Sequence, residues 1–273
     1  MATGRTIDPD PTEIQNLGIQ YEIDVVQQFS GLGYKVDPPA GPDSTKADLQ
    51  IYLPKSNPST EPVKIELKEK LSADFGQLNL DFDFDVDGFY IDENKKSNQA
   101  ESAQVLIALN KSFNAIDKIN RFWNPMGPGK TPNRFHPDYK TWNLQTRVSK
   151  YILDTQKFPS PSSNFISGPQ VVDGVEKYYN SKGVYYLQIK NKGLYCLGQV
   201  NNPQDNPRNW NCSSLSDKIG GGHIRIRVKP NSKNKDRWSF LMALKLEALG
   251  TSDTSLDPWD RDALKKISSQ DFA

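Results

Sequence analysis

Cysteine and histidine are scarce in this chain, which contains two of each among its 273 residues. Cys196 and Cys212 have no Cys-x-x-Cys spacing, which argues against a cysteine-based zinc site and against a disulfide framework. We therefore expect both to be free thiols. His136 and His223 lie far apart in the sequence. Two such histidines argue against a histidine-rich metal site and against a catalytic triad that contains histidine. Carboxylate chemistry remains the main option for a functional site.

Long apolar runs are also missing, since hydrophobic residues make up 36% of the chain and its mean hydropathy is -0.69. No run approaches the roughly 20 apolar residues that cross a bilayer. The N-terminal residues lack the apolar stretch of a signal peptide. We therefore expect a cytoplasmic protein without a membrane partner. The length fits a core domain with one sizeable elaboration.

A formal net charge of +1 hides a segregation of charge along the chain. Basic residues predominate from Arg208 to Arg237, whereas acids predominate from Glu66 to Glu93. A basic surface beside an acidic pocket is what an enzyme acting on a nucleic acid with metal ions needs. Scattered, solvated charge is the alternative interpretation.

The first third of the chain predicts a helix followed by three strands. Apolar residues recur with helical spacing over residues 13–32, and glycines mark the end of that segment. Short strand-like runs follow at residues 34–36, 47–53 and 63–68. A polar, proline-containing turn between the last two runs predicts that the chain returns as a hairpin.

The remainder alternates between polar connections and regular segments. Residues 81–88 read as an extended strand with exposed acids, and residues 98–122 as a long helix. Residues 124–182 are rich in Pro, Gly, Asn and Ser, with a possible helix at 142–153, and are the expected insertion. A hairpin is predicted at 184–190 and 194–198, and a strand at 223–229 is expected to pair with 239–249.

Three side chains on two of these strands indicate a metal-dependent site. Strand alternation sends Glu66 and Lys68 to one face of their strand, away from Ile65 and Leu67. If the neighbouring strand pairs with it, Asp48 joins them. Two carboxylates suit a hard divalent cation, and a nearby lysine can hold or activate a water.

Asp48 followed by Glu66-x-Lys68 resembles the PD-(D/E)xK nuclease superfamily, which includes restriction endonucleases, Holliday-junction resolvases and phage exonucleases. The preceding segments Gly18–Glu22 and Gly31–Val36 are similar to the first helix and strand of the resolvase-like branch. In that branch a helix glutamate often joins the metal site, and Glu22 occupies the matching place. The resemblance covers about residues 13–80.

Three further residues are possible members of this site. Asp43 follows Pro42 and offers a competing "PD" to that of Asp48. Lys70 would share the face of Lys68 if the strand continues. Gln77 falls where several branches of the superfamily carry a glutamine in the helix after the motif.

The resemblance implies an α/β protein with a restriction-endonuclease-like mixed sheet flanked by helices. We expect a nuclease core at 1–123, the insertion at 124–182, and a β-rich part at 183–273 that completes the sheet or binds DNA. Asp48, Glu66 and Glu22 would bind one or two Mg²⁺ ions, and Lys68 would position or help deprotonate the attacking water. A surface ion-pair ladder of Glu66 with its neighbouring lysines is the alternative.

The expected activity is Mg²⁺-dependent hydrolysis of DNA, most simply by a homodimeric type II restriction endonuclease. A structure-specific or phage nuclease and a non-catalytic DNA-binding protein are the alternatives. DNA contacts are expected from basic residues that share one strand face and from the turn that follows. These residues are Arg225, Arg227, Lys229, Lys233, Lys235 and Arg237.

Two rival motifs carry less weight. The run from Asp83 to Gly88 has the first half of an EF-hand loop, but Asn94 stands where the bidentate glutamate belongs. Gly129-Lys130-Thr131 resembles the end of a P-loop, yet Pro125 and Pro128 lack the N–H donors that cradle phosphate. We therefore expect no nucleotide cofactor.

Overall fold

The protein combines helices with two mixed or antiparallel sheets, which confirms the expected α/β class. In this computed structural model the chain forms two compact units: unit 1 comprises Met1–Ala73, Asn180–Lys218 and Gly250–Ala273, and unit 2 comprises Asp74–Tyr179 and Ile219–Leu249. The structure describes residues 11–38, 47–52, 62–70, 74–126, 130–159, 164–197, 210, 212–231, 236–247 and 250–272.

Unit 1 is built on a 6-stranded sheet with the order β1-β2-β3-β7-β8-β9. The first three strands are antiparallel, so the expected hairpin-like return is confirmed. β3 then pairs in parallel with β7, and β7 forms the expected hairpin with β8. The strands are β1 (Lys35–Val36), β2 (Leu49–Tyr52), β3 (Val63–Lys68), β7 (Val184–Ile189), β8 (Gly193–Cys196) and β9 (Ser213–Ser214).

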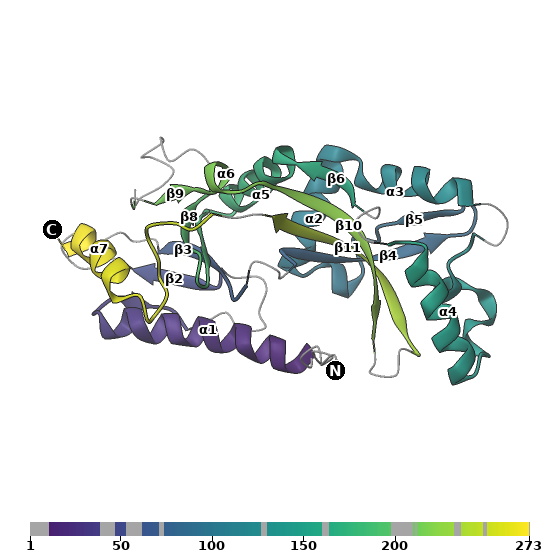
Figure 1. The fold of residues 1–273 in the computed structure, drawn as a ribbon, viewed down its shortest axis with the longest axis horizontal. Coiled ribbons are helices and arrows are strands. Elements are labelled where there is room, and N and C mark those ends of the chain that lie inside the picture. Colours follow the sequence, from purple (N-terminus) through teal and green to yellow (C-terminus); the bar gives the residue numbers. More distant parts are fainter. Residues whose placement is uncertain are drawn as a thin grey trace, which may run out of the picture. The chain divides into compact units, whose positions relative to one another are not determined.

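One face of this sheet carries the hydrophobic core of unit 1. Helix α1 (Pro11–Gly31) runs along this face (Figure 1), and α7 (Arg261–Phe272) also packs against it. The helical spacing of Tyr21, Val25 and Phe29 places all three in the same buried cluster as Ile65 and Leu67. Because side chains alternate along a strand, the polar residues of β3 project from the opposite face.

The first and longer segment of unit 2 is inserted into the connection between β3 and β7, and its second segment, Ile219–Leu249, follows later in the chain. Parallel strands cannot be joined by a tight turn and need a crossover, and here that crossover contains Asp74–Tyr179. The two units therefore divide the chain differently from the three segments expected at 1–123, 124–182 and 183–273. Pairing of β7 with β3 joins the beginning of the expected part at 183–273 to the first segment.

The 5-stranded sheet of unit 2 has the order β5-β4-β11-β10-β6. Strands β10 and β11 form the long antiparallel pair expected from the sequence, and β11 also pairs with β4. The strands are β4 (Gly76–Asp83), β5 (Gly88–Tyr90), β6 (Asn164–Gly168), β10 (Gly221–Pro230) and β11 (Trp238–Glu247). Apolar side chains of β10 and β11, such as Ile226 and Met242, point to one face and are buried.

Two helices replace the single helix expected over residues 98–122. Asn114 has φ 50°, a left-handed conformation that ends one helix and begins the next. The helices of this unit are α2 (Glu101–Phe113), α3 (Ala115–Trp123), α4 (Leu144–Gln156) and α5 (Pro169–Ser181), whose last residues belong to unit 1, and the short 3-10 turns are η1 (Lys96–Asn98), η2 (Asn124–Met126), η3 (Asn133–Phe135) and η4 (Pro137–Lys140). A short helix, α6 (Leu215–Lys218), belongs to unit 1.

The expected insertion is held to the sheet of unit 2 by a buried carboxylate. Asp154 lies on α4, which is the helix predicted at 142–153. Its oxygens accept hydrogen bonds from Asn133 N at 3.0 Å, Asn133 Nδ2 at 2.8 Å and Trp238 Nε1 at 2.9 Å. Because these donors come from η3 and β11, one fully buried side chain joins three elements.

The EF-hand-like run forms the tip of a hairpin, so the extended strand expected over residues 81–88 is interrupted by a turn at residues 84–87. β4 pairs with β5 through Asp83 and Gly88, and Asp83 Oδ1 accepts a hydrogen bond from Asp85 N at 2.8 Å. Asp87 Oδ2 lies 2.8 Å from Lys130 Nζ. Gly129 and Pro128 of the P-loop-like segment lie outside the described residues.

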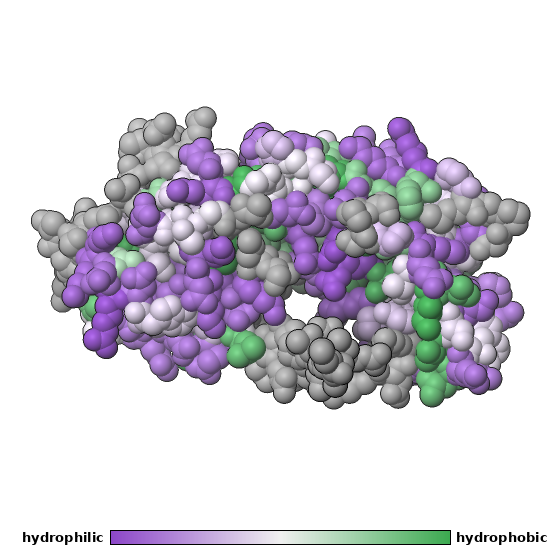
Figure 2. Space-filling model, viewed as in Figure 1, coloured by the Kyte–Doolittle hydropathy of each residue, from purple (hydrophilic) through white to green (hydrophobic). Residues whose placement is uncertain are grey.

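Helix α4 presents apolar side chains to solvent. Leu144, Ile152 and Leu153 are 54%, 48% and 47% exposed, and green surface covers the lower right of Figure 2, where Figure 1 places α4. Exposed apolar side chains are common on protein surfaces, so this strip alone assigns no partner. No helix among the described residues is long and apolar enough to span a bilayer.

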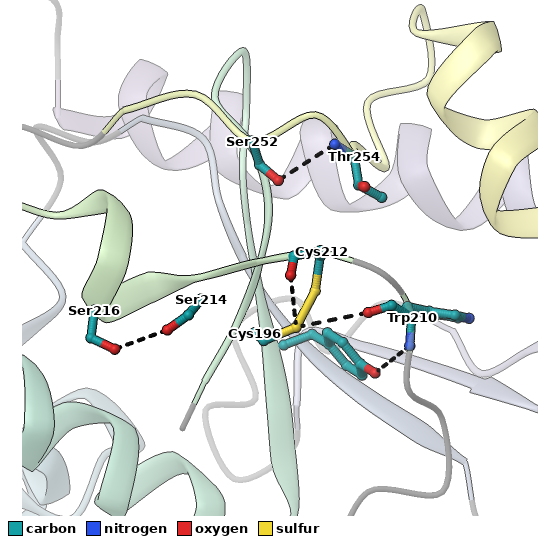
Figure 3. Close-up of a disulfide and its surroundings, with 8 residues drawn as sticks. Cys196, Trp210, Cys212, Ser214, Ser216, Ser252 and Thr254 are labelled. Carbon is teal, nitrogen blue, oxygen red and sulfur yellow. Dashed lines mark hydrogen bonds between the residues drawn. A yellow bond between two sulfur atoms is a disulfide. The ribbon is translucent and has the colours of Figure 1, made fainter. Parts of the chain in front are cut away.

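The two cysteines form a disulfide, so the expectation of free thiols is wrong. Cys196 on β8 bonds to Cys212, which precedes β9 (Figure 3). The parallel pairing of Tyr195 with Ser213 brings the two cysteines together, although no Cys-x-x-Cys spacing signals it. Disulfides are uncommon in cytosolic proteins, and the cytoplasmic location stays a prediction.

Replacing Cys196 and Cys212 together by serine is expected to lower the free energy of unfolding. The bond closes a loop with a sequence separation of 16, and closing a loop of this length stabilises by about 3 kcal/mol. Urea unfolding of the oxidised protein, the reduced protein and the double variant measures the difference. Equal stability of all three, or two reactive thiols in the unreduced, denatured protein, would contradict this bond.

Candidate active site

Asp48, Glu66 and Lys68 come together on the polar face of unit 1, as the sequence predicted. Lys68 Nζ forms an ion pair with Glu66 Oε1 and lies 3.9 Å from Asp48 Oδ2. The side chains are partly covered, with 19% of Asp48, 12% of Glu66 and 19% of Lys68 exposed. Two carboxylates and one ammonium therefore share a small, half-buried space.

The register of β2 and β3 explains this convergence. Leu49 is paired with Ile65, which places the residue before Leu49 opposite Glu66. Asp48 stands where β2 begins, and its Oδ2 accepts a hydrogen bond from Leu67 N at 2.9 Å. The carboxylate thus takes a backbone donor of β3 and is fixed against that strand.

The electrostatics of Asp48 mark a site with more negative than positive charge. Burial raises the pKa of the Asp48 carboxyl to about 8, and the negative charges of Glu66 and Glu22 add to this rise. The Lys68 ammonium and the hydrogen bond from Leu67 oppose it but do not cancel it. Close carboxylates that are hard to ionise together favour a bound cation.

Lys68 is held in its charged form. Burial disfavours the ammonium, but the charges of Glu66 and Asp48 outweigh it, so the pKa of Lys68 lies above its usual value. These surroundings therefore do not lower the pKa of Lys68, so they do not prepare this lysine to accept a proton. Lys68 acts here as a hydrogen-bond donor and a positive charge.

Glu22 contributes to the same site from α1. Its charge raises the pKa of both Asp48 and Lys68, which places it within electrostatic range of both groups. The preceding residue anchors the helix: Tyr21 Oη donates to Asp257 Oδ1 at 2.7 Å, and Asp257 Oδ2 accepts from Asn191 N at 2.8 Å. This buried network holds α1 against the β7–β8 hairpin close to Glu22.

The carboxylates of this site can be compared with the needs of Mg²⁺. No group of three or more His, Cys, Asp or Glu side chains in the described part of the chain is arranged to hold a metal. Mg²⁺ usually keeps several waters and takes one or two carboxylates together with substrate phosphates. Asp48 and Glu66 supply such a pair, and Glu22 adds negative charge nearby.

The structure does not add the three further candidate residues, Lys70, Gln77 and Asp43, to this site. β3 ends at Lys68, so the strand continuation that would bring Lys70 to the same face does not occur. Gln77 lies on β4 rather than on a helix, and its Nε2 donates to Asp74 Oδ2 at 2.7 Å within unit 2. The prediction that Gln77 lies in a helix after the motif is therefore wrong. Asp43 lies outside the described residues.

No family model, curated protein or solved structure matches this chain. The site is therefore supported by its own geometry and by the motif that the sequence carries.

Unit 2 brings together the basic residues of β10 that were expected to contact DNA. Arg225, Arg227 and Lys229 alternate along this strand and share one face. Arg227 Nη1 bonds to Asp74 Oδ2, and Lys229 Nζ lies 3.4 Å from Gln77 Oε1. The face is thus polar and basic.

The turn after β10 is described only in part. Arg237 is exposed, with Nε 4.0 Å from Asp236 Oδ2. Lys233 and Lys235 lie outside the described residues. Their role in binding DNA stays a prediction.

Three residues that matter to these surfaces were missed from the sequence. Asp257 and Asp74 become central only through contacts far along the chain, and no local pattern identifies them. Lys245 did leave a signal, because it interrupts the apolar run Leu244-Lys245-Leu246 of β11. A charged residue inside a buried strand indicates a polar face.

Asp48→Asn is expected to stabilise the metal-free protein at pH 8. An unfolded aspartate titrates near pH 3.9, whereas Asp48 titrates at about 8 in the folded protein. Because the unfolded state releases its proton first, the wild type loses stability as pH rises from about 4 to about 8. The variant avoids this loss, which is at most roughly 5 kcal/mol at about 1.36 kcal/mol per unit.

Urea unfolding in EDTA across this pH range measures the difference. Asp24→Asn is the matched control, since Asp24 lies on the exposed side of α1 and accepts a hydrogen bond from Gln20. A variant with the wild-type pH dependence would show that Asp48 does not carry the strained charge. Added Mg²⁺ should stabilise the wild type more than Asp48→Asn.

Proposed function

We propose that this protein is a Mg²⁺-dependent DNA endonuclease with a restriction-endonuclease-like core in unit 1. The observation that carries the proposal is the convergence of Asp48, Glu66 and Lys68 on one sheet face. The raised pKa of the Asp48 carboxyl supports it, because a cation bound beside Asp48 and Glu66 would favour ionisation of both carboxyls. The mixed sheet with helices on its apolar face is compatible with the expected core.

The side chains divide the work of phosphodiester hydrolysis. Asp48 and Glu66 would hold the metal, which supplies Lewis-acid polarisation of a phosphoryl oxygen and a more acidic water. Glu22 would orient a water from the helix side. Lys68, kept protonated by its two carboxylate neighbours, would donate a hydrogen bond to the attacking water or to a phosphate oxygen and stabilise developing negative charge.

The preferred form of this activity is sequence-specific cleavage by a homodimer of the type II restriction kind, acting in the cytoplasm. Cutting both strands of a duplex needs two active sites, which a symmetric dimer supplies. A structure-specific or phage nuclease with the same core is the second candidate. A DNA-binding protein that has lost catalysis is favoured only by the ion pair of Lys68 with Glu66, which could be purely structural.

Plasmid DNA is expected to be cleaved with Mg²⁺ and left intact in EDTA. Asp48→Ala and Lys68→Ala should each lower the cleavage rate by on the order of a thousandfold, because the first removes a metal ligand and the second removes a positive charge beside the transition state. DNA binding should persist in both variants. Gel analysis of digests gives the rate, and discrete fragments indicate sequence-specific cutting.

Lys64→Ala is the control variant for this experiment. Lys64 lies on the same strand and face as Lys68, at the opposite end of β3, and its loss should leave the rate within about twofold of wild type. If Asp48→Ala or Lys68→Ala cut as fast as wild type, this site assignment would be wrong. Binding without cleavage by the wild type would favour the non-catalytic alternative.

A further inference from the structure

The polar face of the sheet in unit 2 concentrates positive charge around one buried carboxylate. Asp74 is 2% exposed, and its Oδ2 bonds to Arg227 Nη1. Its Oδ1 lies 3.9 Å from Arg225 Nη2, beyond hydrogen-bond distance, and is buried without a hydrogen-bond partner. One carboxylate thus neutralises two guanidinium groups incompletely.

Lys245 adds a third cation from the neighbouring strand. In the β10–β11 register Lys245 is opposite His223, and Arg225 is opposite Ala243. Arg225 and Lys245 are therefore diagonal neighbours on one face, within reach of long side chains. Ala243, the partner of Arg225 in this register, is small and fully buried.

The positive charges of these groups disfavour one another. Burial lowers the pKa of Lys245, and the charges of Arg225 and Arg227 lower it further. Burial and the charge of Arg227 likewise lower the pKa of Arg225. Burial also lowers the pKa of the nearby His223. His223 Nδ1 lies 2.6 Å from Oε1 of Glu247, whose side chain is 54% exposed.

Arg225 also retains an unused donor. Its side chain is 16% exposed, and its Nε is buried without a hydrogen-bond partner. An unsatisfied buried donor on a charged group costs free energy until an acceptor arrives. Three cations, one buried carboxylate and a spare N–H together favour an incoming anion.

We propose that Arg225, Arg227 and Lys245 form a binding site for a backbone phosphate of DNA, with Asp74 holding the Arg227 guanidinium in place. This rests on the proposed function for the identity of the ligand. Guanidinium groups suit phosphate because their planar donors match two of its oxygens. Lys245, from β11, extends the contact surface beyond the single strand β10.

The test measures binding of a labelled DNA duplex in EDTA, so that cleavage does not interfere. Lys245→Gln is expected to weaken binding roughly tenfold and to reduce the log-log salt slope by about 0.9, the value for one lost phosphate contact. Because burial penalises the Lys245 charge, this variant should unfold no more easily than wild type. Arg225→Lys, which keeps the charge but loses Nε, should weaken binding and keep the slope.

Lys111→Gln is the matched control in the same unit. Lys111 lies on α2, is 64% exposed and pairs with Glu93, and α2 packs against the apolar side of β4. Its replacement should leave both the affinity and the slope unchanged. Wild-type affinity and slope in a folded Lys245→Gln variant would overturn the proposal, as would an equal effect of Lys111→Gln.

Inorganic phosphate distinguishes a DNA site from a site for a free anion. Calorimetric binding of phosphate that depends on Lys245, together with an unchanged DNA slope, would overturn the assignment to DNA. The two proposals also fail separately. Plasmid cleavage with an unchanged slope removes this phosphate site alone, whereas a flattened slope without any cleavage removes the nuclease function alone.

Discussion

Parallel pairing of β3 with β7 is the interaction on which the rest of the structure depends. It places the strand that carries Glu66 and Lys68 inside a sheet rather than at its edge. The hydrogen bond from Lys190 N to Lys68 O, at 2.9 Å, extends this pairing to the last residue of β3. Because β3 has a neighbour on each side, the backbone beneath the candidate site is fixed, and its side chains are held in one geometry.

Local patterns predicted most of the individual elements. Strand alternation in β3 and the hairpins of β2 with β3 and of β10 with β11 follow from short segments whose partners are close in sequence. The three site residues could be predicted for the same reason, since Asp48 and Glu66 meet through a local hairpin. The break at Asn114 was missed because asparagine can adopt a left-handed conformation without any obvious signal.

Long-range relations could not be predicted from the sequence. Parallel pairing of β3 with β7, the disulfide of Cys196 with Cys212 and the contact of Tyr21 with Asp257 each join distant segments. Their partners are chosen by packing of the whole unit rather than by spacing. Asp74 illustrates the same limit, because an isolated acid in a polar stretch gives no indication that two arginines will share it.

The discontinuous construction of unit 1 has a consequence for how the protein is made. β3 leaves the ribosome long before β7, with all of Asp74–Tyr179 translated between them. During that interval the apolar face of β2 and β3 has α1 to cover it but lacks α7, and one edge of β3 has no partner. Unpaired strand edges and high contact order slow folding and promote aggregation. The first segment of unit 2, Asp74–Tyr179, thus delays the folding of the unit that holds the candidate site, and unit 2 itself still lacks β10 and β11 when β7 emerges.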